Sequence, residues 1–167
     1  MPVTSSGSAK VTLPKDDQIL ITREFDAPKH LVYKAFTTPE LVKRWWHANR
    51  GEMTVAEIDL QVGGKWRYVM IADGGMEVGF HGEYREIVPN ERIVSTETFE
   101  GLPEGVSEED GTTVNTATFA EADGRTTLAL LVQAPSKATR DAIIDSGMEA
   151  GLQDALDNLE QVAVSLG

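Results

Sequence analysis

The chain has 167 residues, of which 41% are apolar and 25% charged, as is typical of one globular domain with a buried core. Its formal net charge of −12 argues against nucleic acid or an anionic membrane as a partner, because phosphate groups would be repelled, although solubility alone would also explain the acidity. The absence of cysteine excludes disulfides, thiolate nucleophiles and cysteine-based zinc sites.

The N-terminal segment MPVTSSGSAK lacks the apolar run of a signal peptide, and no segment reaches the roughly 18 apolar residues of a membrane span. We therefore expect a cytoplasmic protein. Residues 1–14 are rich in small polar side chains and are predicted to be a disordered tail. Residues 15–167 are then expected to form a single domain.

The first predicted element is a strand at residues 18–26. This segment, QILITREFD, alternates apolar and polar side chains and is rich in Ile, Leu and Thr. Asp26, Ala27 and Pro28 end the strand, and Pro28 suits the first position of a helix.

Two short helices follow. Apolar residues recur at helical spacing up to Phe36, and a second helix is predicted over residues 39–46, opened by Pro39. Its last residues are two adjacent tryptophans, Trp45 and Trp46. At helical spacing both can join one apolar stripe that faces a sheet.

Six alternating segments separated by turn signals come next, at 53–62, 63–72, 77–88, 91–100, 112–121 and 125–134. Consecutive strands joined by short turns indicate an antiparallel meander, since parallel pairs need long crossover connections.

From residue 136 to 166 the apolar period changes from 2 to 3.6, which predicts one long C-terminal helix. Gly147 and Gly151 each weaken such a helix by about 1 kcal/mol relative to alanine. Either the helix packs closely on the sheet at these glycines, or a cavity lies beneath it.

This order of elements is carried by the segments REFDAP, VYKAFTTPELVKRWW, DLQVGGKWRY, HGEYREIVPNERIV and SGMEAGLQDALDNLE. It resembles the START-like (SRPBCC) superfamily over about residues 17–166, and within it the branch named for the activator of the heat-shock-protein-90 ATPase. The resemblance implies an α+β helix-grip fold, in which a curved antiparallel sheet of six or seven strands surrounds the long terminal helix. In many members these elements enclose a hydrophobic ligand cavity.

A ligand site is predicted where inward faces of the strands meet the tryptophan pair and the terminal helix. Small-molecule sites are mostly apolar with a few polar anchors, which Trp N–H, Tyr O–H and His81 can supply here. The alternative is a solid core made of the same side chains. The predicted ligand-binding residues are Trp45, Trp46, Trp66, Tyr68, Met70, Phe80, His81, Tyr84, Phe99, Phe119, Met148 and Leu152.

No catalytic residue, metal site or cofactor is predicted. His30, His47 and His81 lack metal-ligand spacing, and the chain has no nucleophile elbow or phosphate-binding loop. His81 and Glu83 share one face of a strand, where they would form either an acid–base pair or an outward polar surface.

Three functions therefore stay open. The first is a non-enzymatic binding module for a small hydrophobic or aromatic molecule. The second is a co-chaperone-like protein that engages a chaperone partner through its surface. The third is an enzyme of the cyclase or hydrolase type that uses the same cavity. An open cavity favours the first or third, and a filled core with an exposed apolar patch favours the second. The oligomeric state, monomer or homodimer, is not predicted.

Overall fold

The computed structural model describes residues 9–102 and 104–167. The described residues form eight strands and four helices. The strands are β1 (Lys10–Thr12), β2 (Gln18–Phe25), β3 (Gly51–Ile58), β4 (Lys65–Ala72), β5 (Glu77–Val88), β6 (Arg92–Phe99), β7 (Thr112–Ala122) and β8 (Arg125–Gln133). The helices are α1 (Lys29–Thr37), α2 (Pro39–Val42), α3 (Lys137–Asp145) and α4 (Met148–Ser165).

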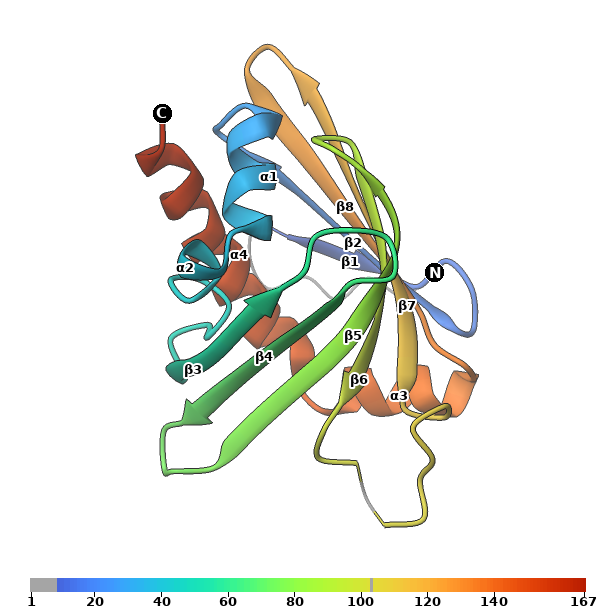
Figure 1. Cartoon of the computed structure of the whole chain (residues 1–167). Helices are drawn as coiled ribbons and strands as arrows, with labels where there is room; N and C mark the ends of the chain where they lie inside the picture. The colour runs from blue at the N-terminus through green and yellow to red at the C-terminus, as the bar shows by residue number, and fades with distance from the viewer. Residues whose placement is uncertain (1–8, 103) are drawn as a thin grey trace.

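The strands form one antiparallel sheet in the order β1-β2-β8-β7-β6-β5-β4-β3. The meander from β3 to β8 follows the chain, and β2 closes the far side by pairing with β8. Figure 1 shows the curved sheet with α1, α2 and α4 on one side of it. This arrangement confirms the predicted α+β helix-grip fold, with a higher strand count than the six or seven expected.

The additional strand is β1, which lies inside the segment predicted to be a disordered tail. Val11 is 1% exposed and pairs with Ile21 of β2. The side chain of Gln153 on α4 bonds both backbone groups of Ala9, accepting from its nitrogen at 2.9 Å and donating to its carbonyl at 2.8 Å. These contacts order a segment whose composition alone indicated disorder. Residues 1–8 of the predicted tail lie outside the described residues.

The predicted single helix over residues 136–166 is two helices. Gly147 adopts a left-handed backbone with φ of 83°, which ends α3 and begins α4 in a new direction. The 18 residues of α4 span about 27 Å at 1.5 Å per residue. The 3.6-residue period continues through the break, so it could not reveal the change of direction.

The second short helix is also shorter than predicted, because α2 ends at Val42 rather than at residue 46. The tryptophan pair lies in the turns that follow. Ala48 and Asn49 are both left-handed, with φ of 54° and 63°, and they redirect the chain into β3.

The two halves of α4 have different surroundings. In its C-terminal half, Leu159 and Ala163 are fully buried in the same core as Val32 and Ala35 of α1. Its N-terminal half crosses the concave side of the sheet at β4 to β8, where the core is not filled. Among the described residues, no helix has the length and apolar character needed to cross a membrane.

Candidate functional site

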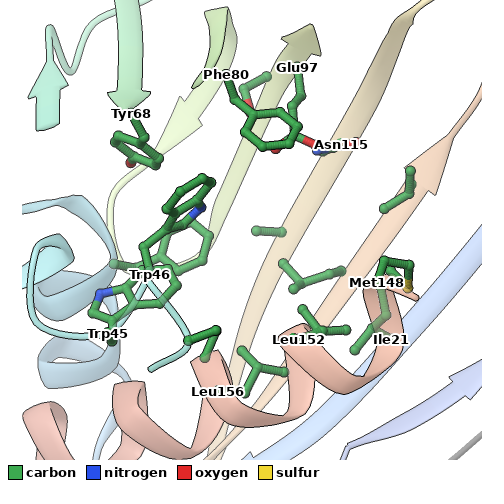
Figure 2. Close-up of a pocket in the computed structure, with 18 of the residues that line it drawn as sticks. Ile21, Trp45, Trp46, Tyr68, Phe80, Glu97, Asn115, Met148, Leu152 and Leu156 are labelled. Atoms are coloured by element: carbon green, nitrogen blue, oxygen red, sulfur yellow. The ribbon is translucent and has the colours of Figure 1, made fainter. Parts of the chain in front are cut away.

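A cavity of about 520 Å³ lies between the N-terminal half of α4 and the sheet. Its floor is formed by side chains of β4 to β8 and β2, and one end is closed by α1 and the tryptophan turn. Figure 2 shows Met148, Leu152 and Leu156 of α4 on one side and Tyr68, Phe80 and Glu97 of the sheet on the other. The lining is mainly apolar, as expected for a small-molecule site.

Nine of the twelve residues predicted from the sequence line this cavity. They come from the tryptophan turn, from β4 and β5, and from the first turns of α4: Trp45, Trp46, Trp66, Tyr68, Met70, Phe80, Tyr84, Met148 and Leu152. The period of 2 in the strands correctly placed Trp66, Tyr68 and Met70 on one face.

The other three predicted residues do not line the cavity. Phe119 is buried beneath α1, edge-on to Tyr33 and Phe36 at centroid distances of 5.5 and 5.6 Å. Phe99 lies at the end of β6, where it contacts the ring of Phe80 but is 37% exposed. Both share the concave face of the sheet with the site, but they lie beyond the cavity.

His81 is on the opposite face of the sheet, because its strand neighbours Phe80 and Gly82 face inward. Its Nδ1 lies 2.9 Å from Oε2 of Glu100, and the guanidinium of Arg67 donates two hydrogen bonds to the same carboxylate, at 2.8 and 2.9 Å. These bonds, led by those from Arg67, lower the pKa of Glu100 to about 2. His81 and Glu83 thus belong to an outward polar surface.

The adjacent tryptophans have different environments. Trp45 is 6% exposed, stacks on Phe36 at 5.7 Å, and donates its indole N–H to the carbonyl of Ala35 at 2.9 Å. Trp46 is half-buried and meets Tyr68 and Phe80 edge-to-face at 5.5 and 5.6 Å. Trp45 therefore fixes the turn to the core, and Trp46 forms part of the aromatic wall.

Trp66 reaches across the neighbouring strand. Its indole N–H donates to the carbonyl of Thr96 on β6 at 3.0 Å and passes over Gly82 of β5. A Cβ at position 82 would lie 2.6 Å from that indole nitrogen and closer still to the Thr96 carbonyl. Only glycine leaves room for this bond, which holds the ring of Trp66 against Tyr68 at 4.7 Å.

Glu97 of β6 and Asn115 of β7 form a polar group in the cavity that was not predicted from the sequence. Asn115 hydrogen-bonds with the Glu97 carboxyl, and its Oδ1 accepts from the hydroxyl of Thr113 at 2.9 Å. Burial raises the pKa of Glu97 above its ordinary value near 4.5, against the opposing effect of Asn115. Glu97 and buried Ile93 lie four positions apart on β6 and therefore share a face of the strand. This alternation is the signal in the sequence that could have identified Glu97 as an inward residue.

The two tyrosines of the wall stay protonated at neutral pH. Burial is the main cause that raises the pKa of both Tyr68 and Tyr84. Tyr84 and Glu97 add to the rise for Tyr68, and Tyr33 and Asp59 add to the rise for Tyr84. Their hydroxyls are therefore uncharged groups that can donate hydrogen bonds. Among the residues that line the cavity, Glu97 is the one with a carboxyl side chain.

The cavity reaches solvent where two of its lining residues, Arg50 and Ser146, are exposed. Here the turn after the tryptophans is tied to α4 by two side-chain contacts. Arg50 donates to Asp154 at 2.8 Å, and Asn158 donates to the side-chain oxygen of Asn49 at 3.0 Å.

Gly151 decides between the two explanations offered for the glycines of the helix. It lines the cavity, and a Cβ built on it would meet no atom within 4 Å. Open space rather than close packing therefore lies beside this glycine.

Within residues 9–102 and 104–167, no group of three or more His, Asp or Glu side chains is arranged to hold a metal ion. The chemistry available in the cavity is burial of apolar surface, aromatic contact, and hydrogen bonding at the carboxyl–amide pair and at the hydroxyls of Tyr68 and Tyr84.

An antiparallel sheet that grips a terminal helix and leaves a cavity beneath it defines a START-like (SRPBCC) protein. The sequence model described as "Activator of Hsp90 ATPase homolog 1-like protein" matches residues 26–163. The chain belongs to this family, as the resemblance of its motifs indicated.

Solved structures of similar fold come from several bacteria. A Rhodobacter sphaeroides protein is 24% identical with a TM-score of 0.84, covering 95% of this chain and 99% of its own. A Chromobacterium violaceum protein is 28% identical with a TM-score of 0.76, covering 89% and 98%. An AHSA1-like protein from Aeromonas hydrophila is 23% identical with a TM-score of 0.66, covering 89% and 94%. No curated protein sequence matches this chain significantly.

Proposed function

We propose that this protein is a non-enzymatic binding module for a small hydrophobic or aromatic molecule held between the sheet and α4. The observation that carries the proposal is the cavity of about 520 Å³ with its aromatic wall. Sites for small molecules have volumes of about 300–1,000 Å³ and consist of apolar walls with a few polar groups.

The walls combine rigid and adaptable surfaces. Trp45 and Trp66 are fixed by hydrogen bonds to backbone carbonyls, so their rings lose little freedom when a ligand binds. Met70 lines the cavity from the sheet and Met148 from α4, and their flexible thioether chains can adjust to ligands of different outline.

The co-chaperone alternative is supported only by the description of the family. An open cavity next to the tryptophan turn is the feature that a ligand-binding module requires, whereas an activator that works through its surface does not need it. We therefore rank the ligand-binding function first.

The test is a titration with Nile red, an uncharged dye whose fluorescence rises in apolar surroundings. We expect saturable binding of one dye per chain, with quenching of intrinsic tryptophan fluorescence. The quenching should be reduced more by Trp46→Phe than by Trp45→Phe, because the ring of Trp46 belongs to the aromatic wall with Tyr68 and Phe80. Absence of saturable binding, or quenching that is the same in both variants, would contradict the proposal.

A further inference from the structure

The cavity holds one feature that a purely hydrophobic ligand would leave unused, the carboxyl group of Glu97. An ionised carboxylate in an apolar environment is costly unless a cation and hydrogen-bond donors compensate its charge. Asn115 supplies a neutral donor to this group. The positive charge that would compensate the carboxylate of Glu97 must therefore come from another group.

The basic side chains on the cavity wall are at its mouth and have other contacts. Arg50 is exposed and donates from the same nitrogen to the carbonyl of Ala48 at 2.7 Å and to Asp154 at 2.8 Å. His47 lies in the same turn, where its Nδ1 accepts from the backbone nitrogen of Asn49 at 2.9 Å. Both side chains are therefore engaged in holding the turn that closes the cavity.

The side chain of Asn115 is oriented to donate to the carboxyl group of Glu97. Its Oδ1 accepts from the hydroxyl of Thr113, which leaves the amide NH₂ to face the carboxyl of Glu97. The oxygen and the NH₂ group of the Asn115 side chain then both have partners within the protein. The remaining lone pairs of the Glu97 carboxyl can accept hydrogen bonds from a ligand. The site thus offers acceptors at its polar end.

The aromatic wall near this group also favours positive charge. The rings of Trp46, Tyr68 and Phe80 form a connected cluster, with centroid distances of 5.5 and 5.6 Å from Trp46 to the other two. Aromatic faces attract cations through their quadrupole, most strongly where water is excluded. Figure 2 shows Phe80 next to Glu97 and Asn115, with Tyr68 and Trp46 on the same side of the cavity.

We propose that the ligand is a hydrophobic molecule with one protonated amine, and that Glu97 is the counter-ion of the ammonium group. This inference rests on the proposed binding function and specifies its ligand class. The net charge of −12 acts in the same direction, since it raises the local concentration of cations and repels acidic ligands.

The test compares three ligands of one shape: 1-naphthylmethylamine, which is a cation at pH 7.5, neutral 1-naphthylmethanol, and anionic 1-naphthoate. Each is titrated against bound Nile red and, independently, by calorimetry. We expect the wild-type protein to bind the amine at least tenfold more tightly than the alcohol, and to bind the naphthoate most weakly.

The same series is measured with Glu97→Gln and, as a matched control, with Glu83→Gln on the outward face of β5. Glu97→Gln should weaken amine binding at least tenfold and change alcohol binding by less than about twofold, since the volume of the side chain is retained. Glu83→Gln should leave all three affinities unchanged.

The proposal is overturned if the alcohol binds as tightly as the amine, or if the preference for the amine survives in Glu97→Gln. In either case the binding function itself would stand, because the uncharged compounds still bind. If neither Nile red nor any naphthyl compound binds, both the ligand class and the binding function are wrong.

Discussion

The indole nitrogen of Trp45 lies 2.9 Å from the carbonyl oxygen of Ala35 and donates to it. In a continuous helix that carbonyl would accept from the residue four positions later, but this residue is Pro39, which has no N–H. The tryptophan side chain thus replaces the missing backbone donor. It joins the end of α1 to the turn that closes the cavity.

Phenylalanine substitutions should separate the roles of the two tryptophans. Trp45→Phe removes a buried hydrogen bond and part of a buried ring, so we expect a loss of about 2–4 kcal/mol in the free energy of unfolding. Trp46→Phe keeps an aromatic ring in a half-buried position and should cost about 1 kcal/mol or less. Urea denaturation measures both, and a larger loss for Trp46→Phe would contradict the assignment.

Glu97→Gln should stabilise the protein at neutral pH. Burial raises the pKa of Glu97 in the folded state, so its ionisation favours unfolding as pH rises above its ordinary value near 4.5. The glutamine keeps an oxygen for Asn115 and does not ionise. We expect its advantage in thermal unfolding to be present at pH 7 and to disappear below about pH 4.5. A variant less stable than wild type at pH 7 would contradict this account.

Glu100→Gln should show the opposite sign. Hydrogen bonds from Arg67 and then His81 lower the pKa of Glu100 to about 2, so its ionised form stabilises the folded state. The contribution is present above the ordinary value near 4.5 and is lost as pH falls towards 2. We expect the variant to melt below wild type at pH 7, with the two curves converging in acid. A constant difference across this range would rule out the electrostatic cause.

Gln153→Ala should release the first strand from α4. The side chain is 6% exposed and makes two hydrogen bonds to the backbone of Ala9, so its loss should cost about 1–3 kcal/mol. Hydrogen exchange should accelerate at Lys10–Thr12 before the rest of the sheet opens. Gln161→Ala, on the exposed side of the same helix, is the control and should leave exchange in β1 unchanged.

Periodicity in the sequence predicted the fold well, because each strand of the meander alternates and each turn carries its own glycine or asparagine signal. Periodicity failed for elements whose structure depends on contacts between residues that are far apart in the chain. Strand β1 is three residues long, and the residue before it, Ala9, is hydrogen-bonded by Gln153, which lies 144 positions away in the chain. The break at Gly147 was missed because α3 and α4 keep one helical period across it.

The aromatic part of the site was predictable from strand parity, since Trp66 and Tyr68 share a face with each other and with the cavity. The polar part follows the same parity, since Glu97 shares a face of β6 with buried Ile93, but it was not predicted. A glutamate on a strand is normally assigned to the solvent face, and nothing adjacent in the sequence marks Glu97 as the partner of Asn115, which lies on the next strand. The prediction that His81 faces inward was wrong. Phe80 faces inward, so the alternation along β5 places its neighbour His81 on the opposite face.

The central claim, that the space beside α4 is a binding site, is tested most directly by filling it. Gly151→Leu places a side chain where no atom lies within 4 Å, and it should also gain about 1 kcal/mol of helix propensity. The control, Ala150→Leu, adds the same side chain on the exposed face of α4. The measurement is the affinity for Nile red at constant fold by circular dichroism. We expect Gly151→Leu to weaken binding at least tenfold without loss of stability, and Ala150→Leu to bind as wild type does. Undiminished binding by Gly151→Leu would contradict the claim.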